Sequence, residues 1–473
     1  MKNAADMFKA EVTRRTLVKG GATGTVAVAL GALASRQASA VQLPYGDDYG
    51  PLAPVNDTTT GLPLLRLPQG FTYSTYGWRG QPMGDGQPTP SAHDGMGVVA
   101  AKVNQIALVR NHEQSGSGIT FRAPADYDSL NNNRGGTTTI LFDATAGKFL
   151  TSYASISGTR TNCAGGITPW GSWLTCEETT SITNGVRHGY VFEVPGFGRA
   201  TGRPLKQLGR FSHEAAAVDT GTGFVYLTED ATPSTLYKFE ASVYGDLEAP
   251  GKLYGLKIKG VDNFNFSGLN GVYVDHAIGT TWDVEWVEVT DVDGVNGRVY
   301  DSAPGCASFA RGEGIWEDGG KFYFVSTSGG VARRGQVFSY DPRRETLTII
   351  FNSTGAGTGD TECDMPDNIS VSPRGGILLL EDGGSSVLRL RGLNQQGKTF
   401  VFAENNINLT AADLGAADLA LKANGGVVAN IPPRSYTNQE FAGGTFYGKW
   451  LFFNIQTPGI TFAVTGPWDN GSL

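Results

Sequence analysis

Short apolar runs separated by glycine-containing turns follow one another along most of the chain. Val, Tyr, Phe, Trp and Thr are frequent in these runs, and helical periodicities are few, as expected of strands. The segment 411–422 (AADLGAADLALK) is the one clear helical candidate beyond the first forty residues. The pattern predicts an all-β protein with tight turns, inserted loops and a short helical insertion.

A two-stranded unit recurs along the chain. It starts at an acidic or small polar residue, passes through a strand, a glycine turn and a second strand, and ends in polar residues. Six copies lie at 94–113, 162–178, 213–230, 312–330, 366–384 and 441–459. The distance between some neighbouring copies is close to one four-stranded blade, and longer gaps indicate insertions. We predict a β-propeller with six blades, and seven blades remain the alternative.

The ends of these units carry many acids. If each unit supplies the two inner strands of a blade, its ends lie at one mouth of the central channel. The predicted ring of polar residues comprises Asn111, Glu113, Cys163, Glu177, Glu178, Glu214, Glu229, Asp230, Arg311, Glu313, Asp367, Asn368, Glu381, Asp382, Asn454 and Gln456. Crowded carboxylates either bind cations or become protonated, and we expect cations. Oxygen ligands suit Ca²⁺, Mg²⁺, Mn²⁺ or Fe³⁺, and a thiolate favours iron. The alternative to a cation site is that these acids lie in solvated loops at the ends of the strands.

The first forty residues differ from the rest. They contain TRRTLVK at 13–19, a weakly apolar Gly/Ala run and ASA at 38–40. This pattern predicts a twin-arginine signal peptide over 1–40, because the apolar run is too short to span a bilayer. A basic disordered leader before a helix is the alternative. We expect the twin-arginine machinery to export residues 41–473, a single β-propeller domain without a membrane anchor, to the periplasm or the cell exterior.

Charge and residue usage exclude several other functions. The net charge is −8, and the part after residue 40 is more acidic still, which argues against a nucleic-acid partner. Five histidines and no G-x-S-x-G motif argue against a Ser-His-Asp hydrolase and a His-rich zinc or copper site. The four cysteines form no CxxC pair, and a disulfide between Cys306 and Cys363 is allowed by the compartment but unsupported.

Several segments resemble the PhoX-type alkaline phosphatases, which are exported β-propeller enzymes. They are TNCAGGITPWGSWLTCEE, FSHEAAAVD followed by VYLTEDA, FARGEGIW, PDNISVSPRGGILLLEDGG and FFNIQTPG. The resemblance extends over about 63–462. It implies a central iron (Fe³⁺) and calcium cluster and the hydrolysis of small-molecule phosphate esters with release of inorganic phosphate.

The resemblance also implies roles for individual residues. Cys163 resembles the iron-binding thiolate, Glu178 lies close to the cluster, and Arg311 resembles the residue that clamps the phosphate. We predict Arg311, Glu313 and Glu214 as catalytic residues. The predicted metal-binding residues are Cys163, Glu178, Glu214, Glu313, Glu113, Asp367 and Glu381. One departure lies at 311–314, where RGEG replaces the RPEG of the family and a flexible turn replaces a rigid one.

Two other functions fit the acidic ring without this resemblance. One is a calcium-dependent propeller hydrolase of the phytase or sugar-lactonase kind, which needs neither Cys163 nor iron. The other is a non-catalytic exported propeller that binds calcium for stability. Iron content and phosphatase turnover distinguish the three, since the fold alone is shared by many functions.

Overall fold

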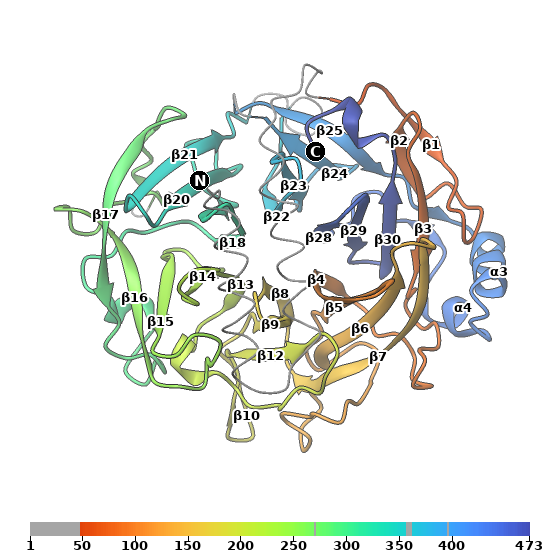
Figure 1. Cartoon of the computed structure of the whole chain (residues 1–473), viewed down its shortest axis with the longest axis horizontal. Coiled ribbons are helices and arrows are strands. Elements are labelled where there is room, and N and C mark those ends of the chain that lie inside the picture. The colour runs from red at the N-terminus through yellow and green to blue at the C-terminus, as the bar shows by residue number, and fades with distance from the viewer. Residues whose placement is uncertain (1–47, 269–270, 356–361, 395–396) are drawn as a thin grey trace, which may run out of the picture.

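Sheets stand around a central axis in the computed structural model, which describes residues 48–268, 271–355, 362–394 and 397–473 (Figure 1). The predicted signal peptide at 1–40 lies outside the described residues. The all-β prediction is confirmed, and the expected helical insertion is found as α3 (Ala411–Ala420), followed by α4 (Gly426–Asn430). Both helices lie at the outside of the ring.

Four sheets in the first part of the ring contain most of the predicted hairpins. The first is built from β4 (His93–Lys102), β5 (Gln105–His112), β6 (Gly135–Asp143) and β7 (Lys148–Thr159). The second contains β8 (Asn162–Ile167), β9 (Ser172–Glu177) and β12 (Val191–Pro195). The third contains β13 (His213–Val218), β14 (Val225–Glu229), β15 (Tyr237–Ala241) and β16 (Gly251–Ile258). The fourth contains β18 (Gly312–Asp318), β19 (Lys321–Ser326), β20 (Gln336–Asp341) and β21 (Thr346–Asn352), and β17 (Thr281–Glu288) joins it to the third.

The last two sheets bring the two ends of the described chain together. The fifth contains β22 (Pro366–Val371), β23 (Ile377–Glu381), β24 (Arg389–Leu393), β25 (Thr399–Asn405), β2 (Leu65–Pro68) and β1 (Leu52–Val55). The sixth contains β28 (Phe441–Tyr447), β29 (Trp450–Ile455), β30 (Ile460–Thr465) and β3 (Thr72–Tyr76). Short pairs are formed by β10 (Ile182–Thr183) with β11 (Val186–Arg187) and β26 (Asn408–Leu409) with β27 (Arg434–Ser435). Because β3 pairs with β30, an early strand completes the last sheet.

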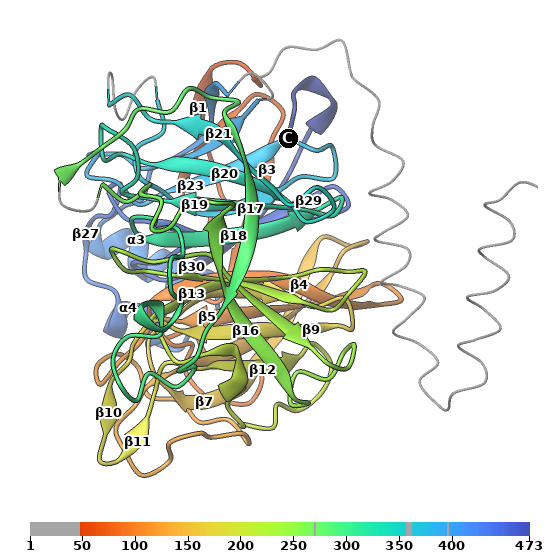
Figure 2. The same cartoon turned by 90° about the vertical axis from the view of Figure 1, so that its left-hand side faces the viewer.

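The innermost strand of each sheet contacts the innermost strand of the next, and the last contacts the first. These strands are β4, β8, β13, β18, β22 and β28. Their labels surround the centre of Figure 1, and Figure 2 shows the same ring from the side. This is the arrangement of a β-propeller, as predicted. The number of blades stays a prediction, which the six inner strands of the described residues support.

Apolar side chains fill the space between neighbouring sheets. Phe142 of β6 contacts Phe452 of β29, with ring centroids 4.9 Å apart, and Tyr226 of β14 contacts Phe322 of β19 at 4.2 Å. Trp173 of β9 packs with residues of the first sheet, as expected for an inter-blade residue. Burial of these faces holds the inner strands together, so residues distant in sequence meet at the axis.

Candidate metal centre at the axis

Every inner hairpin has the same backbone construction at its axial end. The carbonyl of the residue before the inner strand accepts a hydrogen bond from the N–H of the residue after the second strand. The pairs are Ala92–Glu113 (2.9 Å), Thr161–Glu178 (2.8 Å), Ser212–Asp230 (3.0 Å), Arg311–Thr327 (3.0 Å), Met365–Asp382 (3.1 Å) and Glu440–Gln456 (3.1 Å). Near its start, each inner strand then shifts register by a β-bulge. Bulges commonly redirect a side chain, and here they recur beside the axis.

Each hairpin therefore brings three positions to the axis. The first precedes the inner strand: Ala92, Thr161, Ser212, Arg311, Met365 and Glu440. The second comes two residues later, in the irregular stretch: Asp94, Cys163, Glu214, Glu313, Asp367 and Ala442. The third follows the second strand: Glu113, Glu178, Asp230, Thr327, Asp382 and Gln456. We call the charged and thiol groups at these positions the axial cluster: Asp94, Glu113, Cys163, Glu178, Glu214, Asp230, Arg311, Glu313, Asp367, Asp382 and Glu440.

The second positions lie deeper than the third. Asp94 and Glu214 are fully buried, Glu313 is 1% exposed and Asp367 is 6% exposed. At the third positions, by contrast, Glu178 is only partly buried and Asp382 is exposed. The cluster thus has a buried floor and a rim that reaches solvent.

Burial and mutual repulsion make the ionised cluster unstable when no cation is bound. Burial, followed by the charges of Asp367 and Glu178, raises the pKa of Glu214 well above its ordinary range. Burial and the charge of Asp367 raise the pKa of Glu113 to about 7, and burial and the charge of Glu113 raise the pKa of Glu178 to about 10. Burial, followed by the charge of Asp94, raises the pKa of the Cys163 thiol. Bound cations would relieve this repulsion.

Two groups of ligand atoms are close enough to hold a metal ion. Cys163, Glu178 and Glu214 form one group, in which the ligand atoms lie within 4.8 Å of one another. Glu214, Glu313 and Asp367 form the other, by the same measure. Glu214 belongs to both, yet neither of its buried carboxylate oxygens accepts a hydrogen bond within the described residues. A buried carboxylate without donors fits a cation better than an empty space.

Arg311 is the cation that contacts this cluster. Its Nε donates to Asp230 Oδ1 at 2.8 Å and its Nη2 to Asp230 Oδ2 at 3.1 Å, which is a bidentate pair. Nη2 also lies 2.9 Å from Glu313 Oε1. Arg311 adopts a left-handed φ of 52°, whereas the following Gly312 does not have a positive φ. The strained residue of the RGEG turn is therefore the arginine itself, which is held toward the cluster.

The axis narrows directly beneath the cluster. The residues that follow the second positions are Gly95, Ala164, Ala215, Gly314, Asn368 and Gly443, and they line a cavity of only about 20 Å³. A Cβ on Gly314 would lie 2.9 Å from Asn368 Cα, and one on Gly95 would lie 2.5 Å from Ala164 Cα. Small residues thus let the inner strands approach closely. The narrow part of the axis beneath the cluster therefore has no room for a ligand. The side that reaches solvent is the rim, where Glu178 is partly buried and Asp382 is exposed.

The structure brings together seven of the eight predicted site residues. Cys163, Glu178, Glu214, Glu313, Glu113, Asp367 and Arg311 all belong to the axial cluster. Glu381 does not. It is the last residue of β23, and it accepts hydrogen bonds from Arg391 Nε at 2.5 Å and from the N–H of Asp364 at 3.2 Å. Side chains alternate along a strand, so the next residue, Asp382, faces the axis, and we assign this strand's contribution to Asp382.

The same alternation removes two other acids from the predicted ring. Glu177 pairs with His188 at 2.7 Å, and Glu229 pairs with Arg298 at 3.0 Å. Two amides of the predicted ring, Asn111 and Asn454, bind backbone carbonyls instead of the carboxylates of the cluster. Asn111 donates to the carbonyl of Cys163 at 2.9 Å, and Asn454 donates to the carbonyl of Asp94 at 2.6 Å.

Sequence reasoning missed Asp94 and Glu440. Gln456 Nε2 donates to Asp94 at 3.1 Å and to Glu113 at 3.0 Å, so Asp94 lies within the cluster. Burial and the charge of Asp94 raise the pKa of Glu440 well above its ordinary range. Asp94 begins the first repeat, so alignment with Cys163, which holds the same position in the second hairpin, could have found it. Glu440 stands just before the last repeat, where Arg311 stands in the fourth.

The histidines and remaining cysteines take no part in the cluster. Burial lowers the pKa of His213 to about 3, and its Nε2 lies 3.0 Å from the carbonyl of Gly209. His112 contacts the carbonyl of Ser91 and the hydroxyl of Thr138. All four cysteines are free, so Cys306 and Cys363 form no bridge.

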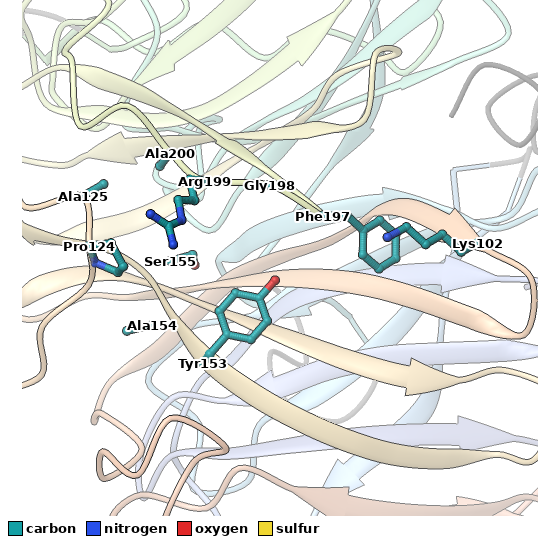
Figure 3. A pocket seen from close by; sticks show the side chains of 10 residues that line it. All are labelled: Lys102, Pro124, Ala125, Tyr153, Ala154, Ser155, Phe197, Gly198, Arg199 and Ala200. Carbon is teal, nitrogen blue, oxygen red and sulfur yellow. The ribbon is translucent and has the colours of Figure 1, made fainter. Parts of the chain in front are cut away.

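A separate groove lies on the outer side of the ring. It has a volume of about 370 Å³ between β7 and the loop after β12, and Lys102, Tyr153 and Arg199 contribute its polar groups (Figure 3). Neither a carboxylate nor a thiol lines it, so it offers no metal ligands comparable to those of the axial cluster. Among the described residues, no helix is long and apolar enough to cross a membrane.

Comparison with known proteins places the chain in a family. The family model described as "Alkaline phosphatase PhoX" matches residues 47–152 and 147–459. PhoX of Pseudomonas fluorescens, solved in complex with vanadate, a transition state analogue, shares 17% identity with a TM-score of 0.62 over 91% of this chain and 99% of that one. A catalytically inactive virginiamycin B lyase from Staphylococcus aureus, solved with quinupristin, shares 11% identity with a TM-score of 0.40 over 84% of this chain and 99% of that one. No curated protein matches.

Proposed function

The chain belongs to the PhoX alkaline phosphatase family, and from this premise we propose that its axial cluster is the metal centre that hydrolyses phosphate monoesters of small organic molecules. The observation that carries the proposal concerns Glu214. Its buried carboxylate belongs to both groups of ligand atoms that could hold a metal ion, and neither of its oxygens accepts a hydrogen bond among the described residues. Acids gathered at this density need cations, and phosphate transfer needs positive charge at the reacting phosphorus.

We propose iron (Fe³⁺) and calcium as the cations. Cys163, with Glu178 and Glu214, would hold iron, since a thiolate favours iron over calcium. The all-oxygen group of Glu214, Glu313 and Asp367 would hold calcium, which prefers carboxylates. When bound, these cations would supply positive charge and activate an oxygen nucleophile, which suits a sequence that contains no G-x-S-x-G motif.

The chain's own residues have distinct tasks in this proposal. Arg311 presents parallel guanidinium donors that would neutralise phosphate oxygens as charge develops, after exchanging Asp230 for the substrate. Glu313 lies beside Arg311 and fixes its direction. The narrow floor at Gly314 keeps the substrate at the rim, so the ester group extends toward solvent. This geometry favours small, soluble phosphate esters of varied shape.

We further propose that the protein works outside the cytoplasm. The twin-arginine pattern over 1–40 supports export of residues 41–473 as one folded domain to the periplasm or the exterior. A protein that is exported in its folded state can carry metals that were inserted before export. The acidic net charge of −8 supports the absence of a nucleic-acid partner.

Hydrolysis of 4-nitrophenyl phosphate by metal-loaded variants tests this function. Glu214→Gln removes the shared ligand and should lower kcat/KM by roughly 10²-fold or more. Cys163→Ser should lower iron content and activity together. Glu248→Gln, an exposed acid 47% accessible and paired with Arg203, is the matched control and should leave turnover unchanged. Full activity of Glu214→Gln at unchanged metal content would refute the assignment.

A further inference from the structure

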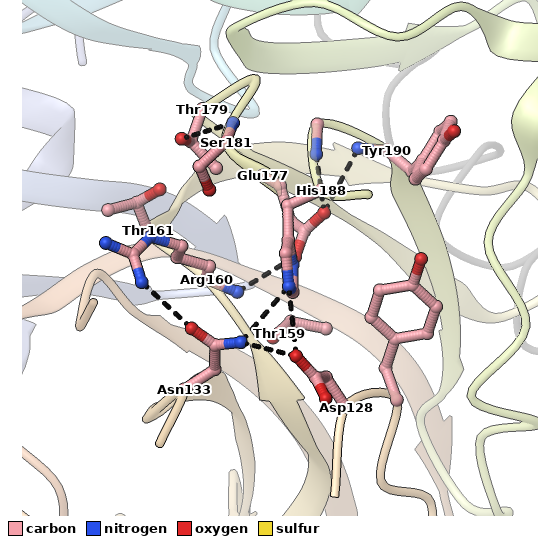
Figure 4. A network of polar contacts seen from close by, with 12 residues as sticks. Asp128, Asn133, Thr159, Arg160, Thr161, Glu177, Thr179, Ser181, His188 and Tyr190 are labelled. Atoms are coloured by element: carbon pink, nitrogen blue, oxygen red, sulfur yellow. Dashed lines mark hydrogen bonds and ion pairs between the residues drawn. The ribbon is translucent and has the colours of Figure 1, made fainter. Parts of the chain in front are cut away.

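Glu177 lies one residue before a cluster acid, yet it faces the opposite way, into a buried polar network (Figure 4). Its Oε1 accepts from His188 Nδ1 at 2.7 Å and from the N–H of Arg160 at 2.9 Å. Its Oε2 accepts from the N–H groups of Gly189 at 2.8 Å and Tyr190 at 3.2 Å. One carboxylate therefore ties the end of β9 to two other segments of the chain.

Those bonds connect the two segments that carry the thiolate group of the metal centre. Arg160 stands three residues before Cys163, and Glu178 follows Glu177 directly. The N–H of Glu178 donates to the carbonyl of Thr161 at 2.8 Å, and the Thr161 hydroxyl donates back to the Glu178 carbonyl at 3.2 Å. These bonds and the bond from Arg160 to Glu177 together connect the segment of Cys163 to the segment of Glu178.

His188 is the group that holds Glu177 from the other side. It is fully buried, and its Nε2 lies 3.4 Å from Asp128 Oδ2 and 3.1 Å from Asn133 Nδ2. Asn133 also donates to Asp128 at 2.7 Å, and its own carbonyl oxygen accepts from Arg160 Nη1 at 2.9 Å. Although burial disfavours the charged ring, hydrogen bonds and charges from Glu177 and Asp128 outweigh it and raise the pKa of His188.

In two other hairpins the acid before the cluster residue also pairs with a basic side chain, in each case an arginine. Glu229, before the cluster acid Asp230, pairs with Arg298 at 3.0 Å. Glu381, before the cluster acid Asp382, pairs with Arg391 at 2.5 Å. A basic side chain therefore contacts the acid that precedes the cluster residue in three hairpins, although the three come from different parts of their sheets.

We propose that His188 is a positioning residue of the metal centre: by clamping Glu177, it holds Cys163 and Glu178 at the separation that a metal ion requires. The proposal rests on the proposed function, since it assumes that these two side chains are ligands. Groups behind metal ligands commonly contribute 10- to 100-fold to metal affinity by fixing the orientation of the ligands. His188 touches neither substrate nor metal in this proposal, so it acts only through Glu177.

Two replacements separate its positioning role from simple packing. His188→Leu removes all three polar contacts of the ring, which are with Glu177, Asp128 and Asn133. His188→Asn keeps an amide donor near the place of Nδ1 and loses the contact to Asp128. His213→Asn is the matched control, because His213 is equally buried beside Glu214, but among the described residues its ring hydrogen-bonds only to a backbone carbonyl and stacks on Phe211. Thermal unfolding identifies which variants are folded.

The readout is titration of the chelated full-length protein with Co²⁺, whose thiolate complexes absorb in the near ultraviolet. We expect His188→Leu to bind Co²⁺ about 10- to 100-fold more weakly, with a diminished thiolate band. His188→Asn should recover part of the loss, and His213→Asn should match the wild type. If His188→Leu does not fold, a reduced affinity of folded His188→Asn supports the proposal.

Two results would overturn the inference. One is a folded His188→Leu variant that binds Co²⁺ as tightly as the wild type does. If His188→Leu does not fold, the same affinity in His188→Asn would overturn the inference. The other is a Co²⁺ complex of the wild-type protein whose absorption spectrum has no thiolate band. Failure of the proposed function is a separate outcome: the wild type would then lack phosphatase turnover, while a thiolate band that is lost in His188→Leu would still support the positioning role.

Discussion

At the scale of single residues, alternation along each strand decides which of two neighbouring acids enters the metal centre. Strand β9 ends at Glu177, which faces His188, whereas the next residue, Glu178, faces the cluster. For the pair Glu381 and Asp382 the sequence offers two acids in a row, but nothing marks where the strand ends. The structure ends β23 at Glu381, so Asp382 faces the axis.

This difference predicts opposite phenotypes for two adjacent substitutions. Glu381→Gln removes the negative charge from the buried pair with Arg391 and should cost about 3–5 kcal/mol of unfolding free energy. Asp382→Asn should leave stability nearly unchanged but weaken calcium binding. Chemical denaturation and calcium titration distinguish them. Asp469→Asn, which breaks an exposed pair with Arg374, is the control and should cost less than about 1 kcal/mol. Equal stability of the Glu381 and Asp469 variants would argue against the assignment.

Arg311 carries a second prediction at the residue scale. Lysine retains the charge but presents one ammonium group in place of two parallel donors, so Arg311→Lys should lower kcat/KM by roughly 10²-fold. Arg344→Lys is the matched control, because the Arg344 side chain is 77% exposed and pairs with Asp341, outside the cluster. Steady-state kinetics with 4-nitrophenyl phosphate measure both variants. Wild-type kinetics for Arg311→Lys would show that point charge alone suffices there.

At the scale of elements, the bulged start of the inner strands is what the sequence could not predict. The recurring order of polar start, strand, glycine turn, strand and polar end located six repeats, with tight spacing in the central four, and short apolar runs identified their strands. A bulge, however, has no reliable sequence mark, and it changes which residue faces the axis. Asp94 has the same position in its hairpin as Glu214 and Glu313, so only alignment of the repeats, and not the strand pattern around it, marks it.

The close approach of the inner strands leads to a prediction for Gly314. A Cβ there would lie 2.9 Å from Asn368 Cα and from the carbonyl oxygen of Asp367, so β18 and β22 must separate. Gly314→Ala should cost about 1–3 kcal/mol and should weaken metal binding, because Glu313 and Asp367 move apart. Thermal unfolding and metal content of the purified variant measure these effects. Gly384→Ala, with no atom within 4 Å of the new methyl group, should change neither.

At the scale of the whole molecule, the ring is completed by pairing of β3 with β30, a connection that lay outside the predicted hairpins. The propeller fold itself followed from the repeats because each hairpin needs neighbours to bury its faces. The metal centre follows from closure of the ring, since acids from different hairpins meet only when the inner strands surround one axis. Its individual ligands could be predicted only where a repeat position had been recognised.

The stability of the chelated protein should therefore depend on pH with an unusual sign. The pKa of Glu113 rises to about 7 and that of Glu178 to about 10, so the metal-free native state binds more protons than the unfolded chain. Stability then falls as pH rises. Between pH 7 and 9 we expect the unfolding free energy to decrease by about 1–3 kcal/mol, measured by urea denaturation. Calcium and iron should abolish the decrease, and an increase with pH in chelator would contradict this origin.

The central claim is that phosphatase turnover depends on iron and calcium held at the axis. Its most direct test is elemental analysis of the natively exported protein, with turnover of 4-nitrophenyl phosphate recorded on the same sample before chelation, after chelation and after return of the metals. We expect the exported protein to contain iron and calcium, chelation to abolish turnover, and return of the metals to restore it. Calcium without iron and no hydrolysis, or full turnover in the chelated protein, would contradict it.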